Sequence, residues 1–403
     1  MSSQPFNTFQ QIFALSWASN LARTCTGSAF EIQEQLSQFL DDQYLETNVG
    51  PGWHMAWGPA AWQYRPKKKP ARPNNVWFVA KNDRCDTDGM DPAPVYVVCI
   101  AGTAGKLLDF DSEVEDLAVG RVVDLNQWIP DSFAGDIIPE PTATANPDFA
   151  GTIPYVSYGT AIGTHVITSM SLATPDGQPS THPCLSTFLK NVSAEPGARI
   201  IFTGHSLGSA LCSSAAFVLA KANILDKFSK VLVYPTAGAS PGERNFVTEF
   251  SQRFPPILPS EEQPIYMTWN QNTINSLDIV PHAWCTLDTY PQNLNVIPTM
   301  YGNSLQDGVR IYWFLEFLRG RLVQRAKHAW PKEPKQNVYI PLPSSIFSSE
   351  KQPVPQTKPQ LEKLLPSGPC QKVTSEGYPP MGESLIMACA EDAPIEQIDE
   401  ENI

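Results

Sequence analysis

The stretch Arg199-Ile200-Ile201-Phe202-Thr203-Gly204-His205-Ser206-Leu207-Gly208 decides which fold we expect. Its first five residues are rich in β-branched and aromatic side chains, as in a buried strand. The residues that follow place apolar side chains on one face of a helix, at Leu207, Leu211, Ala215, Val218 and Ala222. A Gly-x-Ser-x-Gly segment between a strand and a helix puts its serine on a sharp turn that only flanking glycines allow. We therefore predict that Ser206 is a nucleophile.

The two neighbours of Ser206 are expected to have different roles. The backbone N–H of Leu207 lies at the positive end of the predicted helix, where it would stabilise the oxyanion of a tetrahedral intermediate. The side chain of His205 should point away from that of Ser206, because the two residues are adjacent in the chain. We expect His205 to pack under the turn rather than to act as the base.

Strands and helices alternate on both sides of this segment. We expect strands at 76–81, 95–100, 230–234, 264–270 and 337–340, and helices at 162–170, 184–192, 242–253 and about 304–329. A polar stretch, 82–94, should form a hairpin loop between the first two strands. The alternation predicts an α/β fold with a mainly parallel sheet covered by helices on both faces.

Two regions fall outside the alternation. Residues 104–160 combine acidic residues, prolines and scattered apolar side chains, which favours a lid or cap insertion over the site. Residues 346–403 are rich in Pro, Ser, Lys and Glu, which predicts a disordered acidic tail. The globular domain is therefore expected to span residues 1–345.

Composition excludes some classes of function. The chain has 403 residues, 42% of them hydrophobic, and a formal net charge of −13. This charge argues against a nucleic-acid-binding protein, which needs a basic face. The one basic run, residues 65–73, contains prolines and is best explained as an exposed loop, with a membrane-surface contact or a nuclear signal as less favoured alternatives.

The cysteines and the N-terminus bear on the cellular compartment. The eight cysteines are spread along the chain without CxxC spacing, so we expect neither disulfides nor a metal site, and nothing indicates a cofactor. The polar start, residues 1–11, lacks Lys and Arg and matches a secretory signal poorly. No apolar run is long enough for a membrane span. We expect a cytoplasmic protein.

Four blocks in fixed order resemble the class 3, or fungal-type, lipases. They are Val97 to Thr103 (Val-Val-Cys-Ile-Ala-Gly-Thr), Gly204 to Gly208, Thr236 to Phe246, and Asn275 to His282 (Asn-Ser-Leu-Asp-Ile-Val-Pro-His). The first block departs from the family pattern, because Ala101 stands where an Arg usually precedes the Gly. Together the blocks cover roughly residues 75 to 285.

The resemblance implies an α/β-hydrolase fold and an esterase or lipase that acts on acylglycerols or related esters. It further implies that Thr103 supplies the second oxyanion-hole donor, beside Leu207, and that Asp278 is the acid of the triad. Without the family, Asp278 would be one acidic residue among many.

The histidine of the triad is harder to identify. The order in this superfamily is Ser, Asp, His, and only His282 and His328 follow Asp278. His282 is four residues from Asp278 in a proline-containing loop, so its reach to Ser206 is doubtful. The spacing of His328 suits the family, but a cationic helix end also explains a histidine there. The family histidine usually sits as Gln-His near the chain end, and residues 360–380 contain no His.

Three functions follow from these observations. The first is a carboxylic ester hydrolase resembling triacylglycerol lipases, with an acyl-enzyme on Ser206, a lipid-like or other ester substrate, and transient contact with lipid surfaces. The second is a hydrolase scaffold that has lost its base and binds an acyl ligand or a partner. The third is an acyltransferase that uses the same nucleophile.

Overall fold

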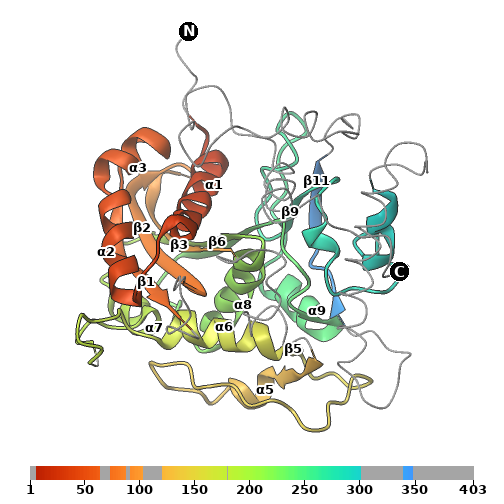
Figure 1. The fold of residues 1–403 in the computed structure, drawn as a ribbon. Helices are drawn as coiled ribbons and strands as arrows, with labels where there is room; N and C mark the ends of the chain where they lie inside the picture. The colour runs from red at the N-terminus through yellow and green to blue at the C-terminus, as the bar shows by residue number, and fades with distance from the viewer. Residues whose placement is uncertain are drawn as a thin grey trace, which may run out of the picture.

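A computed structural model of the chain describes residues 6–63, 73–87, 91–102, 120–178, 180–300 and 339–347. Its centre is a seven-stranded sheet in the order β1-β2-β3-β6-β7-β9-β11 (Figure 1). The strands are β1 (Trp53–Trp62), β2 (Asn75–Cys85), β3 (Ala93–Ile100), β6 (Arg199–His205), β7 (Lys230–Thr236), β9 (Asn272–Asn275) and β11 (Ser344–Phe347).

The sheet is mainly parallel, as predicted. Strands β3, β6, β7, β9 and β11 run parallel to one another, whereas β1 and β2 extend the sheet in antiparallel fashion. β6 is the fourth of the seven strands. The candidate nucleophile therefore follows the central strand, and every parallel strand ends at the same edge of the sheet.

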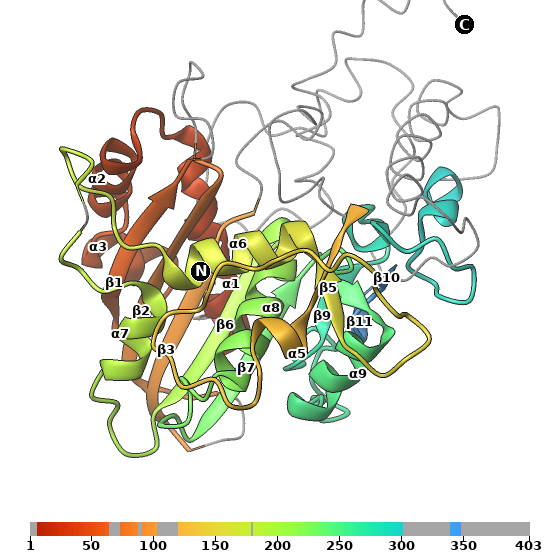
Figure 2. The ribbon, with the colours of Figure 1, turned by 90° about the horizontal axis from the view of Figure 1, so that it is seen from below.

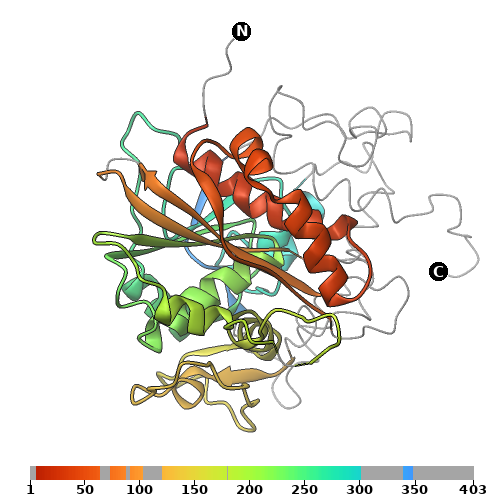
Figure 3. The same cartoon turned by 90° about the vertical axis from the view of Figure 1, so that its left-hand side faces the viewer.

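Helices cover both faces of the sheet (Figure 3). On one face lie α1 (Thr8–Ser19), the short η1 (Asn20–Thr24), α2 (Ala29–Phe39) and α3 (Asp42–Asn48). On the other lie α6 (Tyr158–Ser169), α7 (Leu185–Asn191), α8 (Leu207–Lys221) and α9 (Arg244–Arg253). The predicted covering of both faces is confirmed.

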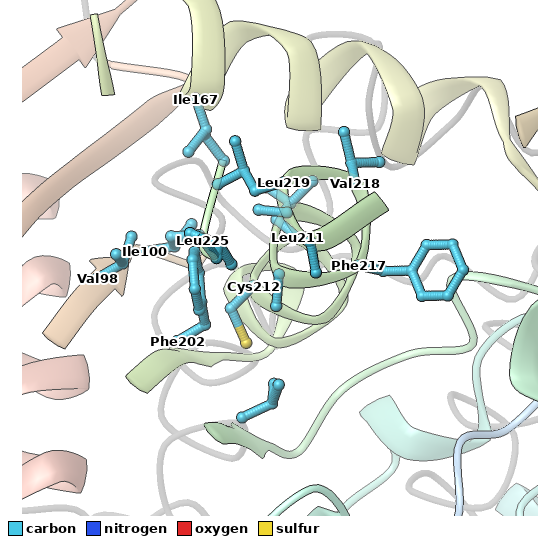
Figure 4. Packing of buried hydrophobic residues seen from close by; sticks show 14 of the residues in the cluster. Val98, Ile100, Ile167, Phe202, Leu211, Cys212, Phe217, Val218, Leu219 and Leu225 are labelled. Atoms are coloured by element: carbon cyan, nitrogen blue, oxygen red, sulfur yellow. The ribbon is translucent and has the colours of Figure 1, made fainter. Parts of the chain in front are cut away.

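Alternating side chains of the strands fill two cores. In β3, Val98 and Ile100 point to the core beneath α8, while Val97 and Cys99 belong to the core beneath α1. Figure 4 shows the first of these, with Val98 and Ile100 near side chains of α8. Complete burial of such side chains is worth about 1.5–3 kcal/mol each, so the strand-helix unit that carries Ser206 is rigidly held.

A second sheet contains part of the predicted lid region. Its antiparallel strands, in the order β10-β8-β5-β4, are β10 (Tyr339–Ile340), β8 (Gly242–Glu243), β5 (Tyr155–Ser157) and β4 (Val122–Asp124). The short α5 (Leu125–Trp128) follows β4. Figure 2 shows the segment from β4 to β5, which includes α5, crossing the outside of α6 and α8. Residues 120–157 thus form ordered structure against the domain, and their role as a lid stays a prediction.

Glu243 joins the second sheet to α9. Its carboxylate, which is 3% exposed, accepts hydrogen bonds from the backbone N–H groups of Tyr155, Asn245 and Phe246. Burial is the main reason that the pKa of Glu243 is raised. A buried carboxyl with three backbone donors is a firm attachment between the two layers.

Several predicted boundaries differ from the structure. The strand expected at 264–270 is wrong: the parallel strand is β9, which begins at Asn272, and residues 264–270 form turns with one bridge, Ile257 to Trp269. The left-handed φ of 65° at Asn270 ends the apolar run before the strand starts. The hairpin loop is shorter than predicted, because β2 continues to Cys85 and β3 starts at Ala93. The helix predicted at 242–253 begins at Arg244.

Other predictions fall outside the described residues. They include the helix at about 304–329, the part of the lid region at 104–119, and the tail from residue 348 onward. Among the residues that are described, the six cysteines are buried, and no two of them form a disulfide. None of the described helices is long and apolar enough to cross a membrane. The sheet itself continues to Phe347, two residues past the predicted domain boundary.

Candidate active site

Ser206 occupies a strained turn between β6 and α8. Its backbone has φ 60° and ψ −124°, a combination that non-glycine residues rarely adopt. The backbone N–H of Ser206 donates to the carbonyl of Thr236 at the end of β7, at 3.0 Å. The side chain is partly exposed, although nearly all of its neighbours are buried. The sharp strand-to-helix turn predicted at Ser206, the elbow, is present in the structure.

Glycine is required on both sides of the elbow. A Cβ built on Gly204 would lie 2.1 Å from the carbonyl oxygen of Gly208. A Cβ on Gly208 would lie 2.3 Å from the carbonyl oxygen of Ile100, at the end of β3. Both contacts are with backbone atoms, which cannot move aside as a flexible side chain would. The two glycines therefore allow three backbone segments to meet under Ser206.

Leu207 is the first residue of α8, a helix of 15 residues. The first N–H groups of a helix have no partner within it and carry the positive end of the helix dipole. The N–H of Leu207 directly follows Ser206, so negative charge that develops on a group attached to the Ser206 oxygen would be stabilised there.

The chain after β3 passes beside the elbow. A Cβ on Gly102 would lie 2.7 Å from the carbonyl oxygen of His205 and 3.4 Å from Cβ of Ser206. The N–H of Gly102 donates to Oδ1 of Asn20 at 2.9 Å. Thr103, the predicted second oxyanion donor, is the next residue and lies outside the described residues.

His205 packs under the elbow, as expected. Its Nδ1 lies 3.2 Å from Oγ1 of Thr236. Its ring meets the rings of Phe13 and Trp17 edge-on, with centroids 6.3 and 5.8 Å apart. These contacts direct the imidazole toward α1, so His205 has a packing role.

Asp278 is buried three residues after the end of β9. Its backbone N–H donates to the carbonyl of Asn275, and its Oδ1 accepts from the N–H of Val280 at 2.9 Å. Its side chain is 2% exposed, and burial raises its pKa to about 7. Because β6, β7 and β9 are parallel neighbours, Ser206 and Asp278 both follow carboxyl ends at one edge of the sheet.

His282 makes a bond that differs from the pattern of a catalytic triad. It ends the short helix η3 (Val280–His282), and its Nδ1 lies 3.1 Å from the carbonyl oxygen of Asn293. A carbonyl only accepts, so Nδ1 carries the proton and donates it there. In a triad, this nitrogen faces the acid. Burial also lowers the pKa of His282, which favours the neutral ring.

His328 lies outside the described residues, together with Thr103.

Asn272 and Asn20 support the site, and the sequence patterns do not single them out. Asn272 bonds both backbone groups of Gly238, accepting from its N–H at 3.0 Å and donating to its carbonyl at 2.9 Å. It thereby ties β9, which leads to Asp278, to the loop after β7.

A central parallel sheet with helices on both faces and a serine on the turn after its middle strand defines the α/β-hydrolase class. Within this class, the family model described as lipase (class 3) matches residues 162–286, from α6 to just beyond Asp278. The chain is thus similar to the class 3 lipases over this matched region, and the resemblance noted in the sequence is confirmed there.

The solved structure of one lipase shares the fold. The crystal structure of M37 lipase is similar with a TM-score of 0.53 and 22% identity, over 82% of this chain and 83% of that one. Lipase II from Rhizopus niveus matches at a TM-score of 0.37 and 15% identity, over 69% of this chain and 76% of that one. At 22% identity, the likeness to M37 lipase concerns the fold alone. A comparison with curated proteins found no match.

Proposed function

We propose that the chain is a carboxylic ester hydrolase that forms an acyl-enzyme on Ser206. The observation that carries the proposal is the backbone of Ser206, held at φ 60° and ψ −124° at the first turn of α8. Strain of this kind costs on the order of 1–3 kcal/mol and persists at functional sites. The class 3 lipase match and the lipase-like fold support an ester as the substrate.

The reaction begins when Oγ of Ser206 attacks the carbonyl carbon of the ester. A histidine takes the hydroxyl proton, and the carbonyl oxygen becomes an oxyanion that accepts hydrogen bonds from the N–H groups of Leu207 and Thr103. The C–O bond to the alcohol then breaks, and the histidine returns the proton to the leaving alcohol. Water attacks the acyl-enzyme by the same route and releases the acid.

His328 is the base in this proposal. The bond of His282 to Asn293 occupies the nitrogen that would face Asp278, which favours a packing role for His282. Asp278 would orient the imidazole of His328 and stabilise it once it is charged. An adjacent imidazolium would also favour the ionised form of the buried carboxyl.

The proposed substrate is an acylglycerol or a related ester with an apolar acyl chain. No cofactor or metal takes part, because the nucleophile, acid, base and oxyanion donors are all protein groups. The proposal includes transient contact with a lipid surface, which such substrates require. Transfer of the acyl group to another alcohol would follow the same steps with that alcohol in place of water.

Labelling with a fluorophosphonate probe tests the proposal. The wild-type protein should be labelled on Ser206, as read by mass spectrometry of the modified peptide, and Ser206→Ala should abolish labelling. Ser213→Ala is a matched control, because Ser213 is buried in the same helix and its hydroxyl bonds the carbonyl of Ser209. Absence of label in the wild-type protein would overturn the hydrolase and favour a scaffold that only binds.

A further inference from the structure

Asn20, the C-cap residue of α1, makes a hydrogen bond to Gly102 beside the elbow. Asn20 follows Ser19, the end of α1, and its side chain is 7% exposed. Its Oδ1 accepts the N–H of Gly102 at 2.9 Å, and its Nδ2 lies 3.4 Å from the carbonyl of Ser16. The carbonyl of Ser16 accepts from Nδ2, and this sets which end of the amide faces Gly102.

We propose that Asn20 is a positioning residue that holds the oxyanion side of the site against Ser206. This inference rests on the proposed function. Its starting point is the tight fit of Gly102: a Cβ built on it would lie 2.7 Å from the carbonyl oxygen of His205. A small movement of Gly102 would either collide with the elbow or open a gap beside Ser206.

The hydrogen bond also determines which N–H groups are left for an oxyanion. Because the N–H of Gly102 donates to Asn20, it is directed into the protein. The proposed oxyanion donors are the N–H groups of Leu207, which follows Ser206 in the sequence, and Thr103, which follows Gly102 in the sequence. Asn20 therefore fixes the position of Gly102, the residue that directly precedes the proposed second donor in the sequence.

The same helix contacts the other side of the elbow. Phe13 and Trp17, in α1, pack edge-on against His205, which precedes Ser206. Asn20 holds the segment after β3, and the two aromatic rings hold the segment after β6. Helix α1 and its C-cap residue thus hold the two segments beside each other, with 82 residues of chain between Asn20 and Gly102.

Loss of this bond should slow the chemical step and leave substrate binding nearly unchanged. An oxyanion donor stabilises the tetrahedral state rather than the bound ester, and removal of one donor costs about 100- to 1,000-fold in rate. A displaced donor should cost less. We expect Asn20→Ala to reduce the maximal rate at which the fluorophosphonate probe modifies Ser206 by about tenfold or more. The probe concentration for half-maximal rate should stay within about twofold.

Asn82→Ala is the matched control. Asn82 is also 7% exposed, and its Oδ1 also accepts a backbone N–H at 2.9 Å, from Arg84. It pairs with Val95, near the opposite end of β3 from Gly102. The melting temperature should fall by a similar amount in both variants, since each leaves one backbone N–H without its acceptor. Only Asn20→Ala should slow the modification of Ser206.

The outcomes separate the inference from the function on which it rests. If the wild-type protein is labelled and Asn20→Ala is labelled at the wild-type maximal rate, the inference is overturned and the proposed function stands. If the wild-type protein is not labelled, both the proposed function and the inference about Asn20 are overturned. Should Asn20→Ala fail to fold, Asn20→Ser serves in its place, because its hydroxyl is one bond too short to reach Gly102 and the same loss of rate is expected.

Discussion

The imidazole of His282 donates from Nδ1 to the backbone carbonyl of Asn293 at 3.1 Å, and this bond occupies the nitrogen that faces the acid in a catalytic triad. The ring is 7% exposed and joins two loops that follow Asp278. A neutral, buried ring with a structural bond leads to specific expectations for stability and for reactivity.

The amide of an asparagine can replace Nδ1 of His282 as donor, but a methyl group cannot. We expect His282→Asn to stay within about 1 kcal/mol of the wild-type free energy of unfolding at pH 8, and His282→Ala to lose about 1–3 kcal/mol. Urea unfolding measures both. Labelling of Ser206 should be unchanged in the asparagine variant, and its loss would identify His282 as the base.

The lowered pKa of His282 has its own consequence for the pH dependence of stability. The unfolded ring binds a proton below about pH 6.5, and the folded ring binds it only at a lower pH. The stability from the neutral ring is thus present above the unfolded pKa and lost as the pH falls through the folded one. As the pH falls from 7 to 5, the free energy of unfolding of His282→Asn should therefore rise relative to that of the wild-type protein.

Because of Asp278, the free energy of unfolding of the wild-type protein should fall as the pH rises. Burial raises its pKa to about 7, so the folded state keeps a proton that the unfolded state loses above about pH 3.9. Stability is lost as the pH rises through the folded pKa. We expect the stability advantage of Asp278→Asn to widen by about 3 kcal/mol from pH 5 to pH 8. A constant difference would show that the carboxyl is already ionised, as beside a cationic imidazole.

His328 is tested by its removal. If it is the base, His328→Ala should lower the turnover of a short p-nitrophenyl ester by at least about 100-fold, in line with general-base catalysis. The melting temperature should be read in parallel, so that loss of folding is not mistaken for loss of chemistry. Wild-type turnover in this variant would exclude His328.

Local signals in the sequence predict the centre of this fold. β6, the elbow and α8 follow each other directly, and each depends on its own hydrophobic pattern. The first helix also carries a readable signal, because Asn7 and Gln10 form a capping box at its start. Such a box is a local signal for the start of a helix.

The misplaced strand shows where the pattern misleads. Tyr266, Met267 and Trp269 supply an apolar run, but they reach the core from turns. The true strand, Asn272–Asn275, is buried and mostly polar, with Asn272 satisfied by the backbone of Gly238. β1 is interrupted by register shifts near Gly58-Pro59, which hide its alternation. Hydrophobic periodicity predicts neither kind of strand.

The supporting residues of the site could not be predicted in the same way. Asn20 meets Gly102 across 82 residues of chain, so no local pattern connects them. Ser206 and its glycines were predictable because the whole turn is encoded in five consecutive residues. Long-range polar contacts depend on the completed fold.

The glycines of the elbow should tolerate no Cβ. We expect Gly204→Ala to cost at least about 3 kcal/mol, since its Cβ would lie 2.1 Å from the carbonyl oxygen of Gly208. Gly197→Ala is the comparison: this glycine has φ +80°, and a Cβ built on it would meet no atom within 4 Å. Its replacement should cost only about 1–2 kcal/mol, the penalty for a left-handed backbone. Equal losses in thermal unfolding would contradict the steric argument.

Relief of backbone strain should make Ser206→Gly more stable than Ser206→Ala. Glycine adopts a positive φ freely, whereas alanine keeps the strain at φ 60° and ψ −124°. After the larger entropy of an unfolded glycine is deducted, we expect a difference of about 1 kcal/mol in the free energy of unfolding. Both variants should be free of label, and a less stable glycine variant would show that the turn is unstrained.

The strained turn separates two kinds of constraint within five consecutive residues. Gly204 and Gly208 are dictated by the close approach of backbone segments, so a chain with this fold needs them whether or not it performs chemistry. The position between them is different, because glycine would suit its backbone better than serine. Drift without selection for reactivity would thus favour losing the hydroxyl first, while the two glycines stayed in place. Among relatives of this chain, the residue at this one position is therefore the sensitive indicator of an active enzyme.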